Sequence, residues 1–302
     1  MDSIQSVSTI EELALLLKFD AAKLHRVLAR APYLYKEIRL IRSDGRERII
    51  NAPRGHLKEI QRSILDHILS KEPIPDCAYG FGPGRTIVEY VAQHAKNSHV
   101  LVTDIKDFFP SVHFTRVNKI FVQMGASDLI AHSLTNLTTL HHALPQGAPT
   151  SPYLSTLSLR VFDARMVALC AENRQTYSRY FDDVAVSGTK RCFEMLEAIS
   201  DIAKSEGHEI YTKPPKLRMF GPEDEKVMTG LIVRNGKIVA PQTEELRTYT
   251  QQLLTMGLAA LQSSNVEKEK QILSGKIAFV QQVEPSAGKL LRTAFNKIDW
   301  QR

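Results

Sequence analysis

The sequence predicts an α+β protein, in which an antiparallel sheet is backed by helices. Runs typical of strands occur at 36–51, 100–104, 177–187 and 227–239, and from Thr243 onward the apolar residues recur only at helical spacing. Hydrophobic residues make up 43% of the 302 residues and charged residues 24%. That composition is typical of a folded globular chain and excludes a disordered, collagen-like or coiled-coil protein.

Several expected helices begin at recognisable caps. Thr9 and Glu12 have the spacing of a capping box, and Asp20 can cap the next helix. The helices expected from apolar periodicity cover 9–18, 20–30, 56–70, 86–96, 114–124, 129–140, a long helix that ends near 170, and 193–205.

Two dipeptides predict hairpin turns. Asp44-Gly45 separates the runs 36–42 and 46–51, which predicts a hairpin with one arginine-rich face. Asn235-Gly236 lies inside 227–239 and predicts a second hairpin. The break near Pro241 is the expected boundary before a helical C-terminal part.

The location expected from the sequence is the cytoplasm. No run approaches the roughly 20 consecutive apolar residues that a membrane-spanning helix needs, so no membrane partner is expected. The N-terminus is polar and has no signal-peptide pattern. Cys77, Cys170 and Cys192 are widely spaced, as small apolar residues in a reducing compartment would be.

The net charge of +6 is concentrated in one segment. Between Asp20 and Arg62 there are eleven Lys and Arg residues against five acids, and eleven minus five equals the whole excess. A basic block within folded sequence indicates a site for a polyanion, although a solvated helix face would explain the charge equally well.

Three aspartates lie where apolar runs end or turn, namely Asp104, Asp182 and Asp183. Burying an unpaired carboxylate is costly, so these positions need a reason. An Asp-Asp pair alone is more often a solvated turn, but magnesium supplies an alternative because it prefers oxygen ligands and leaves positions for substrate phosphates. Two ions about 4 Å apart can stabilise both oxygens of a phosphoryl displacement. The pattern predicts nucleotidyl transfer, and it assigns no metal role to Asp107, three residues after Asp104.

Ordered motifs resemble those of reverse transcriptases. A strand ends in Asp104 within VTDIKDFFPSV, the loop PQGAPTSP follows at 145–152, and the turn Tyr180-Phe181-Asp182-Asp183 is similar to the Tyr-x-Asp-Asp signature. The retron type is the most similar, through IINAPRGHLKEIQRSIL and QGAPTSP and the lack of a recognisable maturase, endonuclease or ribonuclease H segment.

Three positions depart from the retron pattern. Phe181 replaces the usual alanine, and of the Asn-Ala-x-x-His segment only His94 is kept. Met228-Thr229-Gly230 stands where retron enzymes carry Val-Thr-Gly.

The resemblance implies a right-hand polymerase fold. Its parts would be N-terminal helices at 1–35, fingers at 36–99 with part of 113–150, a palm at 100–241, and a helical thumb at 242–302. It also implies two Mg²⁺ ions as cofactors, held by Asp104, Asp182, Asp183 and the backbone carbonyl of Ile105.

The resemblance further implies a nucleotide site. Phe109, five residues after Asp104, would be the steric gate against the ribose 2′-hydroxyl, and Gln146 and Gly147 would line the pocket. Arg46 or Arg48 on the first hairpin would grip the triphosphate, since guanidinium groups suit phosphates.

Other site residues are implied with alternatives left open. Tyr180 would support the primer end, and Arg85 in YGFGPGR would contact the template or serve the loop itself. Lys216 or Lys213 would act near the leaving pyrophosphate, and His94 would take part in RNA handling or simply be packed.

The function implied is RNA-directed DNA synthesis by a retron enzyme. Its partners would be dNTPs, a cognate noncoding RNA and the DNA copied from that RNA. The RNA and the DNA would be joined as a branched hybrid, because synthesis would be primed from a guanosine 2′-hydroxyl. A separate effector protein would act with the enzyme in antiphage defence. Alternatives are a reverse transcriptase of another bacterial group (group II intron-like or abortive infection), a catalytically silent RNA-binding scaffold, and a DNA-templated polymerase. The intact acids argue against the scaffold.

Overall fold

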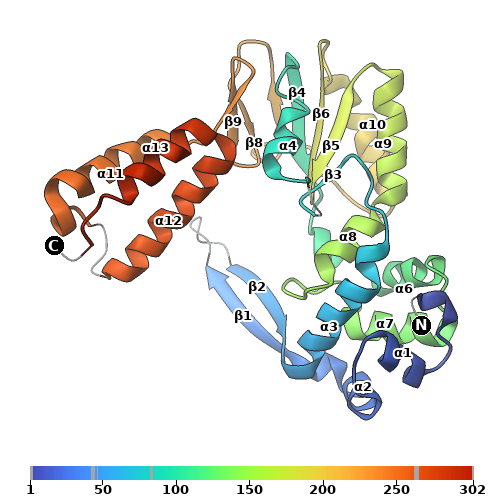
Figure 1. Ribbon diagram of the computed structural model, residues 1–302. Helices are drawn as coiled ribbons and strands as arrows, with labels where there is room; N and C mark the ends of the chain where they lie inside the picture. Colours follow the sequence, from blue (N-terminus) through green and yellow to red (C-terminus); the bar gives the residue numbers. More distant parts are fainter. Residues whose placement is uncertain (1–2, 42–44, 46, 82–83, 262–264, 301–302) are drawn as a thin grey trace.

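The computed structural model describes residues 3–41, 45, 47–81, 84–261 and 265–300. Figure 1 shows a central sheet with helices on both sides, and a long hairpin between the N-terminal and C-terminal helices. The α-helices are α1 (Ile10–Leu16), α2 (Ala21–Leu28), α3 (Gly55–His67), α4 (Ile87–Ala92), α5 (Phe108–Ser111), α6 (Phe114–Gln123), α7 (Asp128–Thr138), α8 (Ser151–Ser158), α9 (Arg160–Glu172), α10 (Leu196–Ser205), α11 (Thr243–Met256), α12 (Val266–Val283) and α13 (Pro285–Phe295). The strands are β1 (Tyr35–Ile41), β2 (Glu47–Pro53), β3 (Ala78–Tyr79), β4 (His99–Asp104), β5 (Thr176–Tyr180), β6 (Asp183–Gly188), β7 (Arg218–Phe220), β8 (Lys226–Met228), β9 (Leu231–Arg234) and β10 (Lys237–Val239).

The central sheet has the strand order β3-β5-β6-β4-β7, and all neighbours are antiparallel except β3 and β5. Its middle strands are apolar because both faces are covered. Leu101 and Val184 belong to one core, whereas Val100, Val102 and Ala185 belong to the other, as the two-residue alternation of strands requires. The α+β class predicted from the sequence is confirmed.

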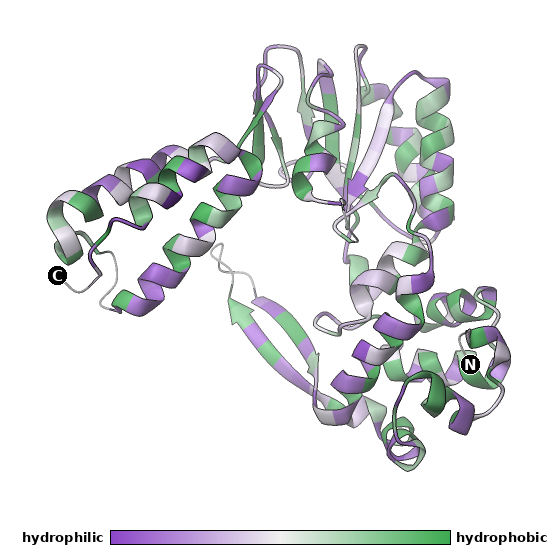
Figure 2. Cartoon of the chain, viewed as in Figure 1, coloured by the Kyte–Doolittle hydropathy of each residue, from purple (hydrophilic) through white to green (hydrophobic). Residues whose placement is uncertain are grey.

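The two cores join different helices to the sheet. One contains buried residues of α1–α3 and α6–α10, and the other contains those of α4, the small sheet β10-β9-β8 and helices α11–α13. Figure 2 shows that these helices carry both apolar and polar stretches, as expected when one side is buried and the other exposed. The C-terminal helices are thereby packed onto the sheet.

The predicted helix starts are confirmed by their caps. The Glu12 amide donates to Thr9 Oγ1 at 3.2 Å, the Thr9 amide donates to Glu12 Oε2 at 3.1 Å, and the Lys23 amide donates to Asp20 Oδ1 at 2.8 Å. The single long helix expected to end near 170 is wrong, because α8 ends and α9 begins on either side of Leu159. Leu159 is apolar and fully buried, so apolar periodicity continues across the break and conceals it.

Strands β1 and β2 form the first predicted hairpin, but its face is not arginine-rich within the described residues. Arg39 lies directly opposite the residue after Arg48, so the two arginines point to opposite faces. Arg39 also donates to Glu37 Oε1 at 2.9 Å, which neutralises its charge. Arg42 and Arg46 lie outside the described residues.

The second predicted hairpin is β9–β10, with Asn235 and Gly236 at its turn and β8 added on the other side of β9. Both turn residues have positive φ, 50° and 73°, as a tight two-residue hairpin turn demands. Helix α11 begins at Thr243, just after Pro241. Among the described helices, none combines the length and apolarity that crossing a bilayer requires.

Candidate active site

Strand register brings the three predicted catalytic acids to one end of the central sheet. Asp104 is the last residue of β4 and pairs with Asp183, the first residue of β6. Asp182 lies in the turn between β5 and β6, where its backbone oxygen accepts a hydrogen bond of 3.0 Å from the Ile105 amide. Asp104 is only 3% exposed. The acids therefore form one cluster, although they are far apart in the sequence.

A buried ion pair holds the turn that carries Asp182. Arg179 Nε and Nη2 each donate to the Asp163 carboxylate at 2.8 Å, and the Tyr177 hydroxyl donates to it at 2.7 Å. Arg179 Nη1 donates to the backbone oxygen of Phe181 at 3.1 Å, and Phe181 has a φ of 54°. Sequence reasoning missed this pair, because a lone acid in a helix and a lone arginine in a strand carry no signal.

The acid cluster concentrates negative charge in a buried place. Burial raises the pKa of Asp183, and so do its hydrogen bond with Asp104 and the negative charges of Asp104 and Asp182. Burial also raises the pKa of Asp182. Lys216 Nζ donates to Asp104 Oδ2, and Thr229 Oγ1 donates to Asp183 Oδ2 at 3.0 Å. A bound cation would relieve the remaining repulsion.

The donor set fits magnesium. Every side-chain donor is a carboxylate oxygen, the ligand that a small hard cation prefers, and Mg²⁺ needs only one or two of them beside water and phosphate. Within the described residues, no three His, Cys, Asp or Glu side chains are already arranged to hold a metal. The Lys216 ammonium contacts Asp104 instead, so a divalent cation at that carboxylate would take over the neutralising role of Lys216.

Two neighbours of the acids were not predicted as site residues. Thr229 has a φ of 46° in the turn between β8 and β9, which directs its hydroxyl to Asp183. Tyr90 of α4 is fully buried, its ring centroid lies 5.8 Å from that of Tyr180, and its hydroxyl has no hydrogen-bond partner within the described residues. The sequence signal for Thr229 is the Met-Thr-Gly segment, and that for Tyr90 is its place as the first residue of the segment 90–94, which departs from the retron Asn-Ala-x-x-His pattern.

The first hairpin and the PQG loop are joined by direct contacts. Arg48 Nε donates to Gln146 Oε1 at 3.0 Å, and the Asn51 amide donates to the Gln146 backbone oxygen at 2.6 Å. Gly147 has a φ of 116°, and a Cβ there would come within 2.7 Å of Ile50 Cγ2. Only glycine allows this loop to approach β2 so closely. Arg48, Gln146 and Gly147 are thus brought together.

A cavity of about 500 Å³ lies beside this contact and is lined in part by Arg48, Gln146, Asp107 and Pro110. Phe109 lies between the last two residues, on the short helix α5, and is half-buried against the core next to Phe108. The predicted gate residue, Phe109, is therefore a direct sequence neighbour of Pro110, which lines the cavity. Arg46 lies outside the described residues.

Tyr180 and Phe181 belong to an aromatic group beside the acids. The Tyr180 ring lies 4.9 Å from the Phe181 ring, which meets the Phe81 ring edge-on at 4.9 Å. Gly80 has a φ of 103°, and a Cβ there would come within 2.6 Å of the Phe181 ring. The glycine-rich loop thereby makes room for a phenylalanine where retron enzymes usually carry alanine.

Within the described residues, neither Arg85 nor Lys213 makes a side-chain hydrogen bond or ion pair with the three acids. Arg85 Nη2 donates to Asp76 Oδ1 at 2.8 Å, and its guanidinium lies 5.7 Å from the centre of the Tyr79 ring. These contacts tie the glycine-rich loop together, so Arg85 has a structural task whatever else it contacts. Lys213 is exposed, whereas Lys216 reaches Asp104, which separates the two candidate lysines.

His94 lies in the interior behind the sheet. Its Nδ1 is 2.6 Å from Ser187 Oγ, its Nε2 is 2.7 Å from Ser178 Oγ, and the residue has no exposed surface. Burial lowers the pKa of His94 to about 3, so the ring is neutral. Both ring nitrogens of His94 have hydrogen-bond partners inside the protein, and the side chain is not accessible to RNA. Of the two alternatives for His94, the structure therefore favours simple packing in the core.

Comparison with known proteins agrees with this geometry. The family described as reverse transcriptase (RNA-dependent DNA polymerase) matches residues 41–233. The chain is 27% identical to the retron Mx162 reverse transcriptase of Myxococcus xanthus, over 99% of this chain and 68% of that protein. It is 30% identical to the retron Mx65 reverse transcriptase of the same organism, over 89% and 65%, and 28% identical to the retron Ec86 reverse transcriptase of Escherichia coli, over 85% and 78%. It thus spans about two thirds of the two Myxococcus relatives. With the acids and the PQG loop placed as described, the chain belongs to the reverse transcriptase family of RNA-directed DNA polymerases and is similar to its retron members.

Proposed function

We propose that the chain works as a right-hand polymerase, with fingers at 36–99 and part of 113–150, a palm at 100–241 and a thumb at 242–302, preceded by N-terminal helices at 1–35. The central sheet strands β5–β7 and all of β4 except its first residue, His99, lie within the palm range, and among the described residues from Thr243 onward there is no strand. The hairpin β1–β2 projects from the N-terminal helices toward the C-terminal helices (Figure 1), and in this proposal the template lies between the two parts.

The observation that carries the function is the pairing of Asp104 with Asp183 beside Asp182. These carboxylates and the Ile105 carbonyl would hold two Mg²⁺ ions, which when bound activate a hydroxyl nucleophile and stabilise the charge that develops on the leaving oxygen. The Lys216 ammonium offsets part of the repulsion among these carboxylates through its contact with Asp104. Lys216 would act near the leaving pyrophosphate once it is released from Asp104, and the exposed Lys213 is the alternative lysine for this role.

The incoming dNTP would bind where the hairpin meets the PQG loop. Arg48, held by Gln146, presents its remaining guanidinium donors toward a triphosphate, and Arg46 shares this role in the proposal. Gly147 keeps the loop close to β2, and the Phe109 ring is the gate against a ribose 2′-hydroxyl. Tyr180, beside Asp183, supports the primer end.

The substrate proposed is a cognate noncoding RNA, copied in the cytoplasm into a branched RNA–DNA hybrid primed from a guanosine 2′-hydroxyl. A separate effector protein would complete an antiphage system. The retron reverse transcriptases to which the chain is similar support this proposal.

The test is the double variant Asp182→Asn/Asp183→Asn. It removes both turn carboxylates but keeps their shape, so DNA synthesis on a primed RNA template should be lost while RNA affinity is kept. The matched control is Asp66→Asn/Asp201→Asn, two exposed acids on α3 and α10. Undiminished DNA product from the first variant would contradict the assignment of the acids.

A further inference from the structure

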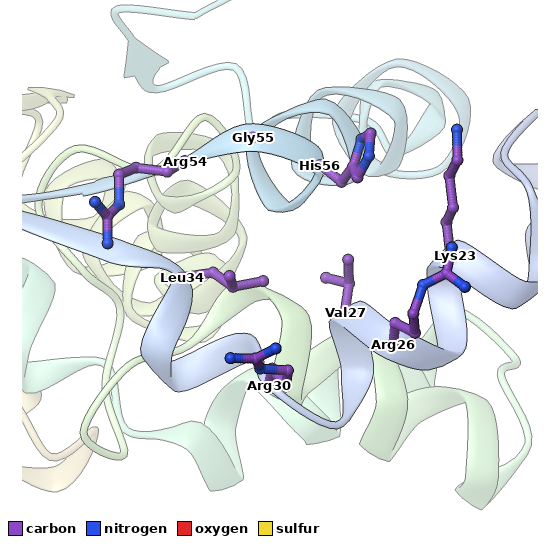
Figure 3. A pocket seen from close by; sticks show the side chains of 8 residues that line it. All are labelled: Lys23, Arg26, Val27, Arg30, Leu34, Arg54, Gly55 and His56. Carbon is purple, nitrogen blue, oxygen red and sulfur yellow. The ribbon is translucent and has the colours of Figure 1, made fainter.

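A basic cavity lies among the N-terminal helices, at the base of hairpin β1–β2. Its volume is about 470 Å³, and it is lined by Lys23, Arg26, Val27, Arg30, Leu34, Arg54, Gly55 and His56. Figure 3 shows Val27 and Leu34 pointing into its middle, with the basic side chains around them. None of these residues lines the cavity beside Gln146 or belongs to the acid cluster.

The cations of this cavity are unpaired. Within the described residues, the side chains of Lys23, Arg26, Arg30 and Arg54 make no hydrogen bond or ion pair, and no acid lines the cavity. By contrast, the Arg85 guanidinium is neutralised by Asp76 and the Arg160 guanidinium by Glu72. Four like charges around one hollow repel one another, so an anion bound there would be stabilised and the repulsion relieved.

The cations form two rows that continue beyond the cavity. Lys23, Arg26 and Arg30 follow the i, i+3, i+7 spacing of one face of α2 and its end, and Arg54, Lys58 and Arg62 follow the i, i+4, i+8 spacing of one face of α3. All six residues are exposed. A small anion would need only one pair of these charges, whereas an extended polyanion can follow both rows.

The floor of the cavity is apolar. Val27 is 5% exposed and Leu34 is half-buried. An apolar floor under a cationic rim suits a nucleotide, whose base or sugar can lie on the floor while its phosphates meet guanidinium groups. A paired duplex keeps its bases stacked inside and cannot offer one to a hollow. Helix α3 also begins here without a side-chain cap at Arg54, which adds to the positive potential.

We propose that this cavity binds the phosphate backbone of single-stranded RNA and seats one nucleotide over Val27 and Leu34. It is a second RNA contact, separate from the acid cluster, and it would hold template away from the site of synthesis. This inference rests on the RNA-templated function proposed above and names the surface that retains the RNA.

The test is the variant Arg26→Gln/Arg30→Gln in the full chain, with a fluorescent oligouridylate as the probe. Loss of two phosphate contacts should weaken binding on the order of 10-fold at 0.15 M salt, and should reduce the slope of log Kd against log salt by about 1.4. The control Arg174→Gln/Arg191→Gln removes two exposed arginines elsewhere and should leave both values near wild type. All four residues are exposed, so the fold should persist, which circular dichroism checks.

Competition identifies the occupant. Oligouridylate should displace the probe far better than uridine monophosphate, polyglutamate or a perfect RNA duplex at equal phosphate or charge concentration. Equal displacement by any of the three, or an unchanged salt slope in Arg26→Gln/Arg30→Gln, overturns the proposal. The polymerase function is judged separately, because Asp182→Asn/Asp183→Asn should keep the wild-type salt slope, and Arg26→Gln/Arg30→Gln should keep its DNA synthesis rate at saturating template.

Discussion

Asp163→Asn should be among the most damaging single changes in the described structure, although Asp163 touches neither substrate nor metal ligand. Its carboxylate accepts two hydrogen bonds of 2.8 Å from Arg179 and one of 2.7 Å from Tyr177. Arg179 is fully buried and Asp163 is 1% exposed. The substitution keeps the shape but leaves the guanidinium charge uncompensated, which costs about 3–5 kcal/mol. Since a whole domain is stable by roughly 5–15 kcal/mol, this is a large share.

Urea unfolding of the full chain, followed by circular dichroism, measures the loss. The exposed control Asp201→Asn should stay within about 0.5 kcal/mol of wild type. The double variant Asp163→Leu/Arg179→Met should be more stable than Asp163→Asn, because it leaves no unpaired charge behind. A loss below about 1 kcal/mol for Asp163→Asn, or a double variant no better than the single one, would refute the reasoning.

Three further outcomes are expected. Thr229→Val removes the hydroxyl that donates to Asp183 at 3.0 Å, and it should lower the DNA synthesis rate several-fold, which corresponds to a barrier higher by about 1 kcal/mol. Thr229→Ser keeps a hydroxyl and should retain the wild-type rate. Equal rates for the two variants would contradict a role for the hydroxyl. Phe109→Ala should admit ribonucleotides in a primer-extension assay, and unchanged sugar discrimination would argue against a gate. Burial lowers the pKa of His94 to about 3 and that of His208 to about 4, below the ordinary value of 6.5. Both histidines therefore bind protons more readily in the unfolded chain than in the folded one. The free energy of unfolding should be highest above pH 6.5 and should decrease below it, by up to about 1.4 kcal/mol per pH unit for each histidine. Urea midpoints across that range should fall less steeply for His94→Gln than for wild type, and identical slopes would contradict a buried neutral ring.

Tertiary contacts separated residues that the sequence treated alike. Lys213 and Lys216 were equal candidates for the pyrophosphate side, and only the position of the chain after α10 shows that Lys216 reaches Asp104. Arg85 and His94 looked like possible RNA contacts, but one is tied to Asp76 and the other is enclosed between two serines. The sequence pattern around an arginine or a histidine does not reveal whether the side chain contacts solvent, RNA or a neighbouring strand.

By itself the sequence determined the class of the fold, the helix caps, the hairpin turn at Asn235-Gly236 and the three acids. These features depend on neighbours a few residues apart, since capping, turn geometry and apolar alternation are local. Only the tertiary structure decided that Arg179 and Asp163 hold the turn that carries Asp182, that Thr229 reaches Asp183, and that Arg26 and Arg54 line one cavity. Each of these depends on segments that are distant in sequence and are brought together by strand register and core packing, which no local pattern records.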